Sequence, residues 1–334
     1  MVAAAVIRAS NSRLPSHLVA VFVGATSGIG EYNLKAFAKH CPSPRAYFIG
    51  RSQPAATRIL SELKVLNPAG EYTFIQGDIS LLKKVDEVCE EIKSKEKSIN
   101  ILVLSQGTLV MGVDTAEGIH LPAALCMYSR LRFIVNLLPL LQAAPTLRRV
   151  VSIFTGSKEG PILSTDWQAR NLNGSLIKLR AQGATMHTLA LEKIAEKAPD
   201  VAFVHDYPGA VRSNIAREGT WAIKLLGMVV KIFAPLICVP NEVSGERHLY
   251  LETSAAYPAK VGGNDGVAME EGDQAAKGIE GKLGSGQYSC DQVCDAASDT
   301  VVQVLKQARA EGKDKELWEE VQKQFLRITG KVSI

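Results

Sequence analysis

The sequence has little of several features that mark particular protein classes. Only 6% of its 334 residues are aromatic, its formal net charge is +4, and no basic run is interleaved with aromatics, so nucleic acid is not an expected partner. Met1 to Leu18 contains no apolar core of signal-peptide length. The six cysteines are scattered, without a second ligand pair or histidine cluster, and predict free thiols rather than a metal site. We therefore expect a cytoplasmic protein without a metal ion.

The composition permits one large core. With 46% hydrophobic and 22% charged residues, we expect residues 1–334 to form a single α/β domain, with 214–286 as a lid or insertion within it. The apolar run Trp221 to Pro240 is about as long as a membrane-spanning helix, but it contains Lys224 and Lys231, and charges inside a membrane are costly. We interpret it as a mobile, apolar substrate lid, with a membrane anchor as the alternative.

The strongest signal begins at Val19. Val19 to Val23 is an unbroken apolar run that is typical of a strand buried on both faces. Gly24, Gly28 and Gly30 follow, and Glu31 to Lys39 is compatible with a helix. A backbone without Cβ atoms can approach a pyrophosphate closely, and a helix N-terminus offers free N–H groups. The stretch predicts a dinucleotide phosphate cradle, with an ordinary strand-turn-helix as the alternative.

Two motifs carry a resemblance to a known family. The spacing Gly-x-x-x-Gly-Ile-Gly with Ala-Thr-Ser inside it resembles the short-chain dehydrogenase/reductase family. Pro208 to Ser213 resembles that family's Pro-Gly-x-Val-x-Thr element, with Ser213 keeping the hydroxyl. The pattern looks like divergent members from fungal secondary-metabolite pathways. It implies a Rossmann-type, doubly wound, mostly parallel sheet of about seven strands, with helices on both faces and an extended C-terminal lid.

Apolar runs and turn residues place the remaining elements. The run from Ile119 to Gln142 is apolar over most of its circumference, and the resemblance implies that this helix packs against a partner subunit in a homodimer or homotetramer. Further strands are expected at Arg45 to Gly50, Tyr72 to Gln76, Ser98 to Leu104, Arg148 to Phe154, Val201 to Asp206 and Gln287 to Tyr288. Further helices are expected at Pro54 to Leu66, Leu81 to Lys95, Ser175 to Glu196, Asn241 to Thr253 and Asp314 to Ile328.

Cofactor preference depends on Arg51, which directly follows the second strand. That end of the strand lies beside the adenosine ribose in the dinucleotide fold, and a basic residue favours the 2′-phosphate, so NADP is expected rather than NAD; a solvated arginine is the alternative. The resemblance assigns Asp78 to the adenine amino group, with an N-cap of the helix from Leu81 as a further role. The predicted cofactor residues are Gly24, Thr26, Ser27, Gly28, Ile29, Gly30, Arg51, Asp78, Ile79, Gly107, Pro208, Gly209, Val211 and Ser213.

The usual catalytic residues of the family are altered. Family reductases use a tyrosine as proton donor, a lysine four residues later, a serine after the fifth strand and a helix asparagine. Counting back from Leu189 to Glu192 places Ser175 and Leu179 at the tyrosine and lysine positions, and no Tyr-x-x-x-Lys occurs between 150 and 200. The asparagine position falls on Cys126 and the serine position on Thr155. At the turn Ser105 to Gly107, only the glycine of the family's Asn-Ala-Gly remains.

Four residues are the predicted catalytic set: Thr155, Arg130, Ser175 and Lys178. Arg130 lies about 40° from Cys126 on a helical wheel and shares its face, which predicts an oxyanion or phosphate contact, with an interhelix salt bridge as an equal alternative. Lys178 lies about 60° from Ser175, with simple solvation as its alternative. The other polar residues considered are Ser157 as a hydrogen-bond donor, Asp166 as a general base or turn residue, and His187 and His205 as structural residues.

Three functions remain open from the sequence. The first is an NADP-dependent oxidoreductase that reduces a ketone or enone of a bulky apolar small molecule. The second is a non-redox isomerase, cyclase or dehydratase on the same fold, which the altered catalytic positions favour. The third is a cofactor-binding regulatory protein without turnover.

Overall fold

The computed structural model describes residues 2–163, 166–170, 175–213, 215, 238–262 and 266–333. Most of the predicted lid Trp221 to Pro240 therefore lies outside the described residues. The sheet has seven strands, all parallel to their neighbours, in the order β3-β2-β1-β4-β5-β6-β7. This confirms the predicted fold class. The strands are β1 (Val19–Val23), β2 (Arg45–Gly50), β3 (Glu71–Gln76), β4 (Ile101–Leu104), β5 (Arg149–Ile153), β6 (Ala202–Asp206) and β7 (Gln287–Cys290).

Strand β1 lies in the interior of the sheet, and both of its faces are apolar. Val21 and Val23 contribute to the core on one face, and Ala20 and Phe22 to the core on the other. The strand pairs with β2 on one side and with β4 on the other. The chain order reverses here, so the carboxyl ends of β1 and β4 border the crevice in which ligands bind in this class of fold.

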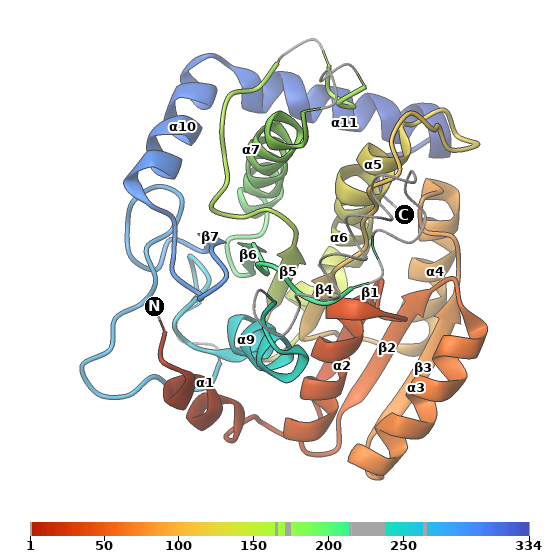
Figure 1. The fold of residues 1–334 in the computed structure, drawn as a ribbon, viewed down its shortest axis with the longest axis vertical. Coiled ribbons are helices and arrows are strands. Elements are labelled where there is room, and N and C mark those ends of the chain that lie inside the picture. Colours follow the sequence, from red (N-terminus) through yellow and green to blue (C-terminus); the bar gives the residue numbers. More distant parts are fainter. Residues whose placement is uncertain are drawn as a thin grey trace.

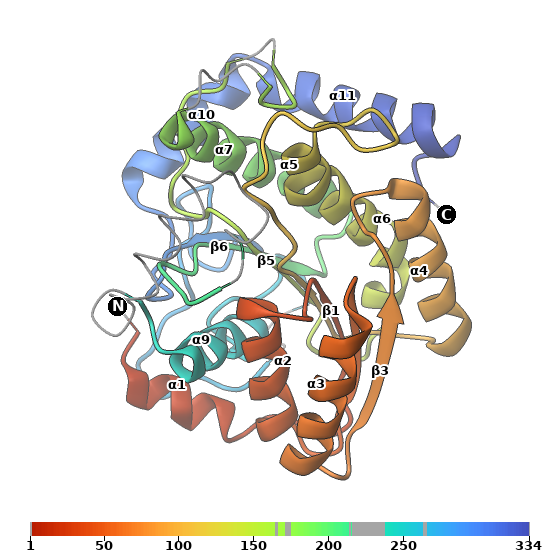
Figure 2. The ribbon, with the colours of Figure 1, turned by 45° about the vertical axis from the view of Figure 1, so that its right-hand side comes forward.

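Helices cover both faces of the sheet (Figures 1 and 2). One face carries α2 and α3, with α9 packed on α2 and α1 packed on α9; the other carries α4, α6 and α7, with α10 and α11 beyond them. The bounds on the first face are α1 (Ala4–Asn11), α2 (Gly28–His40), α3 (Gln53–Leu66) and α9 (Asn241–Thr253). Those on the second are α4 (Leu82–Lys95), α6 (Ser129–Gln142), α7 (Leu176–Ala195), α10 (Asp299–Ala310) and α11 (Lys313–Thr329).

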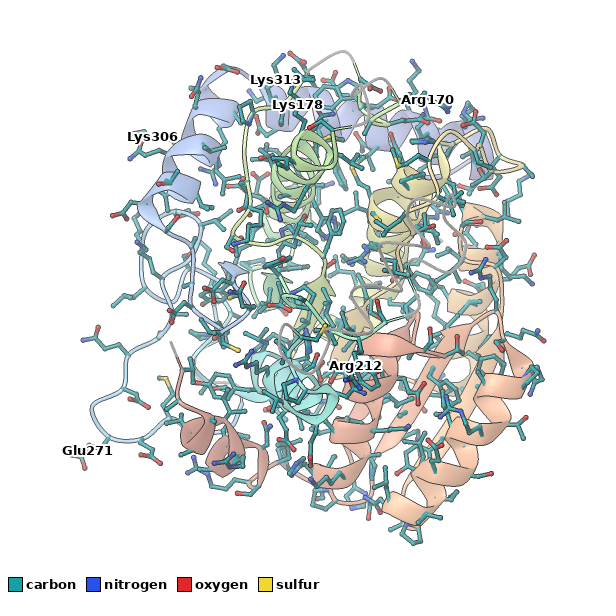
Figure 3. The ribbon with its side chains drawn as sticks, viewed as in Figure 1. Arg170, Lys178, Arg212, Glu271, Lys306 and Lys313 are labelled. Carbon is teal, nitrogen blue, oxygen red and sulfur yellow. The ribbon has the colours of Figure 1, made fainter. Side chains whose placement is uncertain are left out.

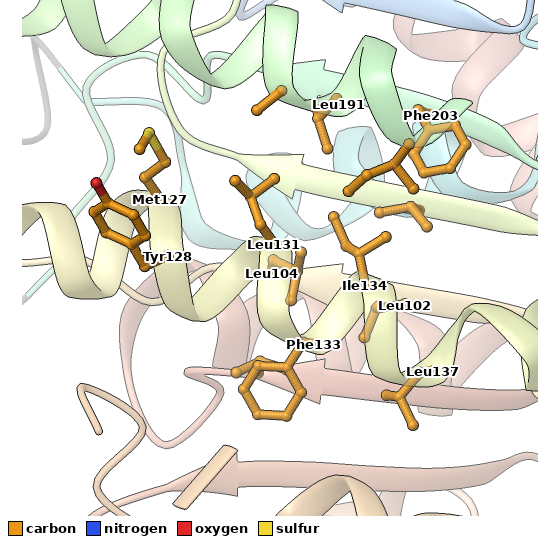
Figure 4. Packing of buried hydrophobic residues seen from close by; sticks show 14 of the residues in the cluster. Leu102, Leu104, Met127, Tyr128, Leu131, Phe133, Ile134, Leu137, Leu191 and Phe203 are labelled. Carbon is orange, nitrogen blue, oxygen red and sulfur yellow. The ribbon is translucent and has the colours of Figure 1, made fainter. Parts of the chain in front are cut away.

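The predicted helix from Ile119 to Gln142 contains three segments: α5 (Leu121–Ala123), the π-helix η1 (Ala124–Tyr128) and α6. Wide π turns of this kind are frequent at functional sites. Figure 4 shows how α6 packs its Leu131 and Ile134 toward the strand that carries Leu102. Within the described part of the chain, Leu121–Gln142 alone is long and apolar enough to span a membrane, and 67% of its most apolar window is buried inside the protein.

Helix α11 packs on α4 and α7 from within the same chain. Its Leu317, Val321 and Phe325 are fully buried in the core. Arg132 of α6 stacks on Phe325, with 5.1 Å between the guanidinium carbon and the ring centroid. Helix α11 therefore adds a further layer over α4 and α7.

Helix α9 has the bounds expected for the helix at Asn241 to Thr253, within the predicted 214–286 insertion. Its Leu249 and Leu251 are buried in the core, and Gly245 packs so closely on α2 that a Cβ atom would lie 2.6 Å from the Tyr32 carbonyl oxygen. This portion belongs to a helical layer of the fold.

Candidate cofactor and active site

Two cavities lie along the carboxyl edge of the sheet. The first has a volume of about 450 Å³ and is bordered by the glycine-rich turn after β1. The second, about 310 Å³, is largely apolar and lies between η1, the turn after β5 and α7. Thr108 lines both of them.

The glycine-rich turn requires its glycines. Gly24 and Gly28 have φ values of +83° and +61°, in the left-handed region that favours glycine. A Cβ on Gly24 would lie 2.7 Å from the backbone nitrogen of Gln106, and one on Gly30 would overlap the Ser105 hydroxyl. Helix α2 begins at Gly28, so its free N–H groups border the first cavity, as an anion-binding helix terminus requires.

The first cavity brings together most of the predicted cofactor residues. Arg51 lies exposed at the carboxyl end of β2. The residue before it, Gly50, packs closely on the glycine-rich turn: a Cβ atom on Gly50 would lie 2.5 Å from the Thr26 side chain. Pro208, Gly209 and Val211 lie outside the lining, on the loop after β6. Those that line the cavity are Gly24, Thr26, Ser27, Gly28, Ile29, Gly30, Arg51, Asp78, Ile79, Gly107 and Ser213.

The loop after β6 lies over the glycine-rich turn. The Tyr32 hydroxyl of α2 donates to the backbone oxygen of Arg212 at 3.0 Å. A Cβ on Gly28 would lie 3.1 Å from that of Ser213, so the two meet across the cavity. Figure 3 shows Arg212 near the centre of the molecule, over α2. The loop therefore closes one side of the predicted cradle.

Asp78 does not cap the following helix, as one sequence interpretation proposed. Its Oδ1 accepts from the Ser80 backbone N–H at 3.1 Å and from the Ser80 hydroxyl at 2.8 Å. Helix α4 begins at Leu82, and Glu117 caps it: Oε2 accepts from the Leu82 N–H at 2.6 Å and Oε1 from the Lys83 N–H at 3.1 Å. The Asp78 carboxylate stays exposed on the first cavity.

The second cavity suits a bulky apolar group. Polar atoms are few on its wall, and Leu179 on α7, which the sequence count assigns to the lysine position, is part of that wall. Burial raises the pKa of the Cys126 thiol, so that thiol is neutral. Its lining residues are Thr108, Leu109, Pro122, Ala123, Cys126, Met127, Phe154, Thr155, Trp167, Gln168, Ala169, Ile177, Leu179, Arg180, Gly183 and Met186.

A strap, residues 166–170, contributes Trp167, Gln168 and Ala169 to the wall of this cavity. His120 holds it twice: its backbone N–H donates to Gln168 Oε1 at 2.9 Å, and its Nδ1 lies 2.9 Å from the Gln168 backbone oxygen. Nε2 of His120 accepts from the Gly112 N–H at 3.1 Å, which assigns the ring proton to Nδ1. Arg170 and Asp114 form an ion pair at 2.5 Å at the edge of the strap. Asp166 caps the strap's turn by accepting from the Arg170 N–H at 2.8 Å, as the turn interpretation predicted.

Arg130 does not reach the second cavity. It is 1% exposed, and its N–H groups donate to the backbone oxygens of Leu104 at 3.0 Å, Ile153 at 2.9 Å and Gln106. A further bond runs to the Ser152 hydroxyl at 2.8 Å, and the guanidinium stacks under Phe154. Burial lowers the pKa of Arg130 to about 10. The expected oxyanion contact and the expected interhelix salt bridge are both replaced by main-chain anchoring of the β4 and β5 ends.

Thr155 does border the second cavity. It is 9% exposed, and its Oγ1 has no hydrogen-bond partner among the described residues. Its backbone N–H donates to Nε2 of His205 at 3.1 Å, so the ring proton sits on Nδ1, which lies 2.7 Å from the Thr188 hydroxyl. The Thr188 hydroxyl in turn donates to Glu159 at 2.8 Å. This buried chain fixes the turn that carries Thr155.

The remaining predicted catalytic residues lie outside the cavity wall. Ser175 caps α7 by accepting from the Lys178 backbone N–H at 3.4 Å, and the Lys178 side chain is exposed. Figure 3 shows Lys178 at the outer end of α7. Ser157 also lies outside the wall, and His187 and His205 are fully buried, as structural residues are. No cluster of three or more potential metal ligands occurs in the described ranges.

The comparisons with known proteins agree with this geometry. Residues 18–122 match the family model described as short chain dehydrogenase. An oxidoreductase of Emericella nidulans is 39% identical over 330 residues, which cover 96% of each chain. The chain belongs to the short-chain dehydrogenase/reductase family. Oxidoreductase andH of Emericella variicolor is 34% identical over 97% of each chain, and a short-chain dehydrogenase/reductase of Stachybotrys chartarum is 29% identical over 94% of each.

Solved short-chain dehydrogenase/reductase structures share the fold. The RhlG/NADP active-site complex of Pseudomonas aeruginosa superposes with a TM-score of 0.55 at 16% identity, covering 79% of this chain and 98% of that one. Four residues of the site in this short-chain dehydrogenase/reductase were not predicted from the sequence: Thr108, Glu117, His120 and Glu159. Only Thr108 carried a usable signal, because it directly follows the glycine of the turn after β4.

Proposed function

We propose that this protein is an NADP-dependent oxidoreductase that reduces a ketone or enone carbonyl of a bulky apolar substrate. One observation carries the proposal: a cleft with the features of a dinucleotide site and a largely apolar cavity share a wall residue, Thr108, at the carboxyl ends of β4 and β5. A cofactor in the first cavity would thus lie next to a substrate in the second.

The residues of the first cavity fit NADP. Glycines at 24, 28 and 30 leave room for the pyrophosphate beside the N-terminus of α2, and the Arg51 guanidinium supplies positive charge for a 2′-phosphate. The RhlG/NADP active-site complex, which shares this fold, supports the choice of cofactor. When bound, the reduced cofactor supplies the hydride for carbonyl reduction.

The chain's own residues orient the substrate and its oxygen. The apolar wall binds the body of the substrate, and the strap over it excludes water, which strengthens every hydrogen bond inside. The Thr155 hydroxyl, which has no partner among the described residues, donates to the carbonyl oxygen as negative charge develops there. With Ser175 and Leu179 at the tyrosine and lysine positions, the catalytic site is non-standard.

A non-redox isomerase, cyclase or dehydratase is the second candidate, because the proton donor and its lysine are both replaced. The test incubates the purified chain and NADPH with a panel of bulky ketones and enones, following cofactor absorbance and product mass. Loss of NADPH with a product two hydrogens heavier supports the oxidoreductase. An isomeric or dehydrated product without NADPH loss supports the second candidate, and cofactor binding with no product supports a regulatory protein.

The wider setting follows from the same features. The relatives from Emericella and Stachybotrys, together with the apolar cavity, support a role in fungal secondary metabolism. Six free cysteines support a reducing cytoplasmic compartment. The homodimer or homotetramer implied by the family would have to use a surface other than the one that α11 covers.

A further inference from the structure

We propose that Thr108 is a second hydrogen-bond donor to the substrate's carbonyl oxygen, acting together with Thr155. The inference rests on the proposed function, because it places a carbonyl group where the two cavities meet. Thr108 is half-buried and lines both cavities, so it lies on the boundary between them. Reaction at a carbonyl requires such a shared boundary between cofactor and substrate.

A backbone N–H holds the Thr108 hydroxyl oxygen in place. Its Oγ1 accepts a hydrogen bond from the Val110 backbone N–H at 3.1 Å. A threonine hydroxyl has one proton and two acceptor lone pairs, so this contact fixes the oxygen while leaving the proton available for a ligand. The Thr155 Oγ1 is buried and has no hydrogen-bond partner among the described residues, so a carbonyl oxygen brought against it would satisfy a donor that is otherwise unpaired.

Strand register places the two threonines on neighbouring turns. Leu104 of β4 pairs with Ser152 of β5, and neighbouring strands lie about 4.8 Å apart. Thr108 follows the first of these positions by four residues and Thr155 follows the second by three. Both hydroxyl-bearing turns therefore leave the same edge of the sheet, side by side.

Arg130 ties these two turns together from beneath. On the Thr108 side it donates to the backbone oxygens of Leu104 and Gln106. On the Thr155 side it donates to the backbone oxygen of Ile153 and to the hydroxyl of Ser152. Because one rigid guanidinium holds both turns, the separation of the two hydroxyls is set by a side chain that touches neither cavity. Arg130 is thus a positioning residue for the donor pair.

Two donors from two strands would hold the carbonyl oxygen in place of the family's tyrosine and serine hydroxyls. As the oxygen gains negative charge, each hydroxyl bond strengthens, and loss of one such donor lowers kcat by about 10²-fold in acyl-transfer enzymes. Removing the Thr108 hydroxyl should therefore lower turnover by about 10²-fold, with Thr108→Ser restoring it.

The test reads the hydrogen bond itself. Camphor with an isotopically labelled carbonyl is bound to the protein with oxidised NADP, so that no reduction occurs, and its carbonyl stretch is recorded by infrared difference spectroscopy. We expect a band below its frequency in an apolar solvent, which moves upward in Thr108→Val and in Thr155→Val and returns in Thr108→Ser. Thr57→Val is the matched control, because that hydroxyl is exposed on α3 and donates to the Gln53 backbone oxygen at 3.2 Å.

The outcomes separate the two proposals. An unshifted band in the unaltered protein, or one that Thr108→Val leaves in place while the variant keeps its melting temperature, overturns the role of Thr108. The band can respond to Thr108→Val even if none of the ketones tested causes the protein to oxidise NADPH. That result supports the donor pair and contradicts the oxidoreductase function. In Arg130→Lys the carbonyl band should move upward from its frequency in the unaltered protein, but by less than in Thr108→Val, if Arg130 positions the donor pair. An Arg130→Lys variant that binds the ketone and leaves the band at its original frequency overturns this role.

Discussion

Arg132 on α6 holds Asp86 on α4 through two parallel hydrogen bonds, one from Nε at 2.6 Å and one from a terminal nitrogen at 2.7 Å. Its other terminal nitrogen donates to the backbone oxygen of Lys331 at 2.9 Å and to that of Val332, so the end of the chain is fixed to the same guanidinium. The Arg132 side chain is fully buried. One side chain thereby joins two helices of the core to the segment that follows α11.

Replacing Arg132 should cost much more stability than replacing an exposed cation. We expect Arg132→Met to lower the free energy of unfolding by about 3 kcal/mol, because removing one partner of a buried pair leaves the other charge poorly compensated. Lys95→Met, which breaks an exposed pair with Glu91 at 2.6 Å, should change it by less than about 1 kcal/mol. Urea unfolding of both variants measures the difference, and equal losses would contradict the buried role.

Arg51 should decide the cofactor. Exchanging it for aspartate removes the charge that faces the 2′-phosphate and adds one suited to a ribose hydroxyl. A charge-assisted hydrogen bond is worth about 1.5–3 kcal/mol, so the ratio of NADP to NAD affinity should fall by roughly ten- to a hundredfold. Calorimetric titration with each nucleotide measures this ratio. An unchanged ratio with both nucleotides still bound would refute the assignment.

The strap should govern substrate binding without affecting the cofactor. Arg170→Ala removes the ion pair with Asp114, and we expect a several-fold rise in KM for a bulky ketone while the Kd of NADPH stays constant. The pair is over a third exposed on each side, so stability should change by less than about 1 kcal/mol. Asp114→Asn should reproduce the effect. A loss of cofactor affinity in either variant would contradict the prediction, because the strap would then affect the first cavity as well as the second.

Acid should destabilise the protein partly through His205. Burial, followed by the nearby Arg130 charge, lowers the pKa of His205 from 6.5 to about 3. The folded state therefore keeps this ring neutral where the unfolded state binds a proton, and stability falls as pH drops from about 6.5 toward 3 by up to about 1.4 kcal/mol per unit.

The matched comparison is His205→Asn, measured by urea unfolding at pH 7 and pH 5. Glu159, whose pKa burial raises, faces the same ring at 3.8 Å and is present in both proteins, so its opposite contribution largely cancels. The variant should lose less stability between the two pH values than the unaltered chain. Parallel losses would place the acid sensitivity elsewhere.

The fold could be predicted from local patterns because parallel strands buried on both faces are continuous apolar runs, as Val19 to Val23 is. Contacts between distant segments could not. Glu117 caps a helix that begins 35 residues earlier in the chain, and His120 forms hydrogen bonds with Gln168, 48 residues later. No local capping or turn rule contains those pairings. Helix α10 was also missed by the sequence interpretation.

Arg130 shows a different limit of sequence reasoning. The helical wheel compared its direction with that of Cys126, but four residues also move a side chain about 6 Å along the axis. Cys126 therefore reaches the cavity wall, whereas Arg130 lies below it, behind Phe154. An angle on the helical wheel does not give the position of a side chain along the helix axis. Whether that position falls at the cavity wall or below it depends on where the neighbouring strands end.

The start of α7 has a consequence for engineering. Ser175→Tyr would remove the helix's N-cap, which typically costs about 1 kcal/mol, and Leu179→Lys would bring an ammonium group to a largely apolar wall. Grafting the family's tyrosine and lysine onto this scaffold therefore requires a new helix start and a more polar cavity floor, not two substitutions. A designer who wants a tyrosine at position 175 and a lysine at position 179 would have to rebuild the start of α7 first.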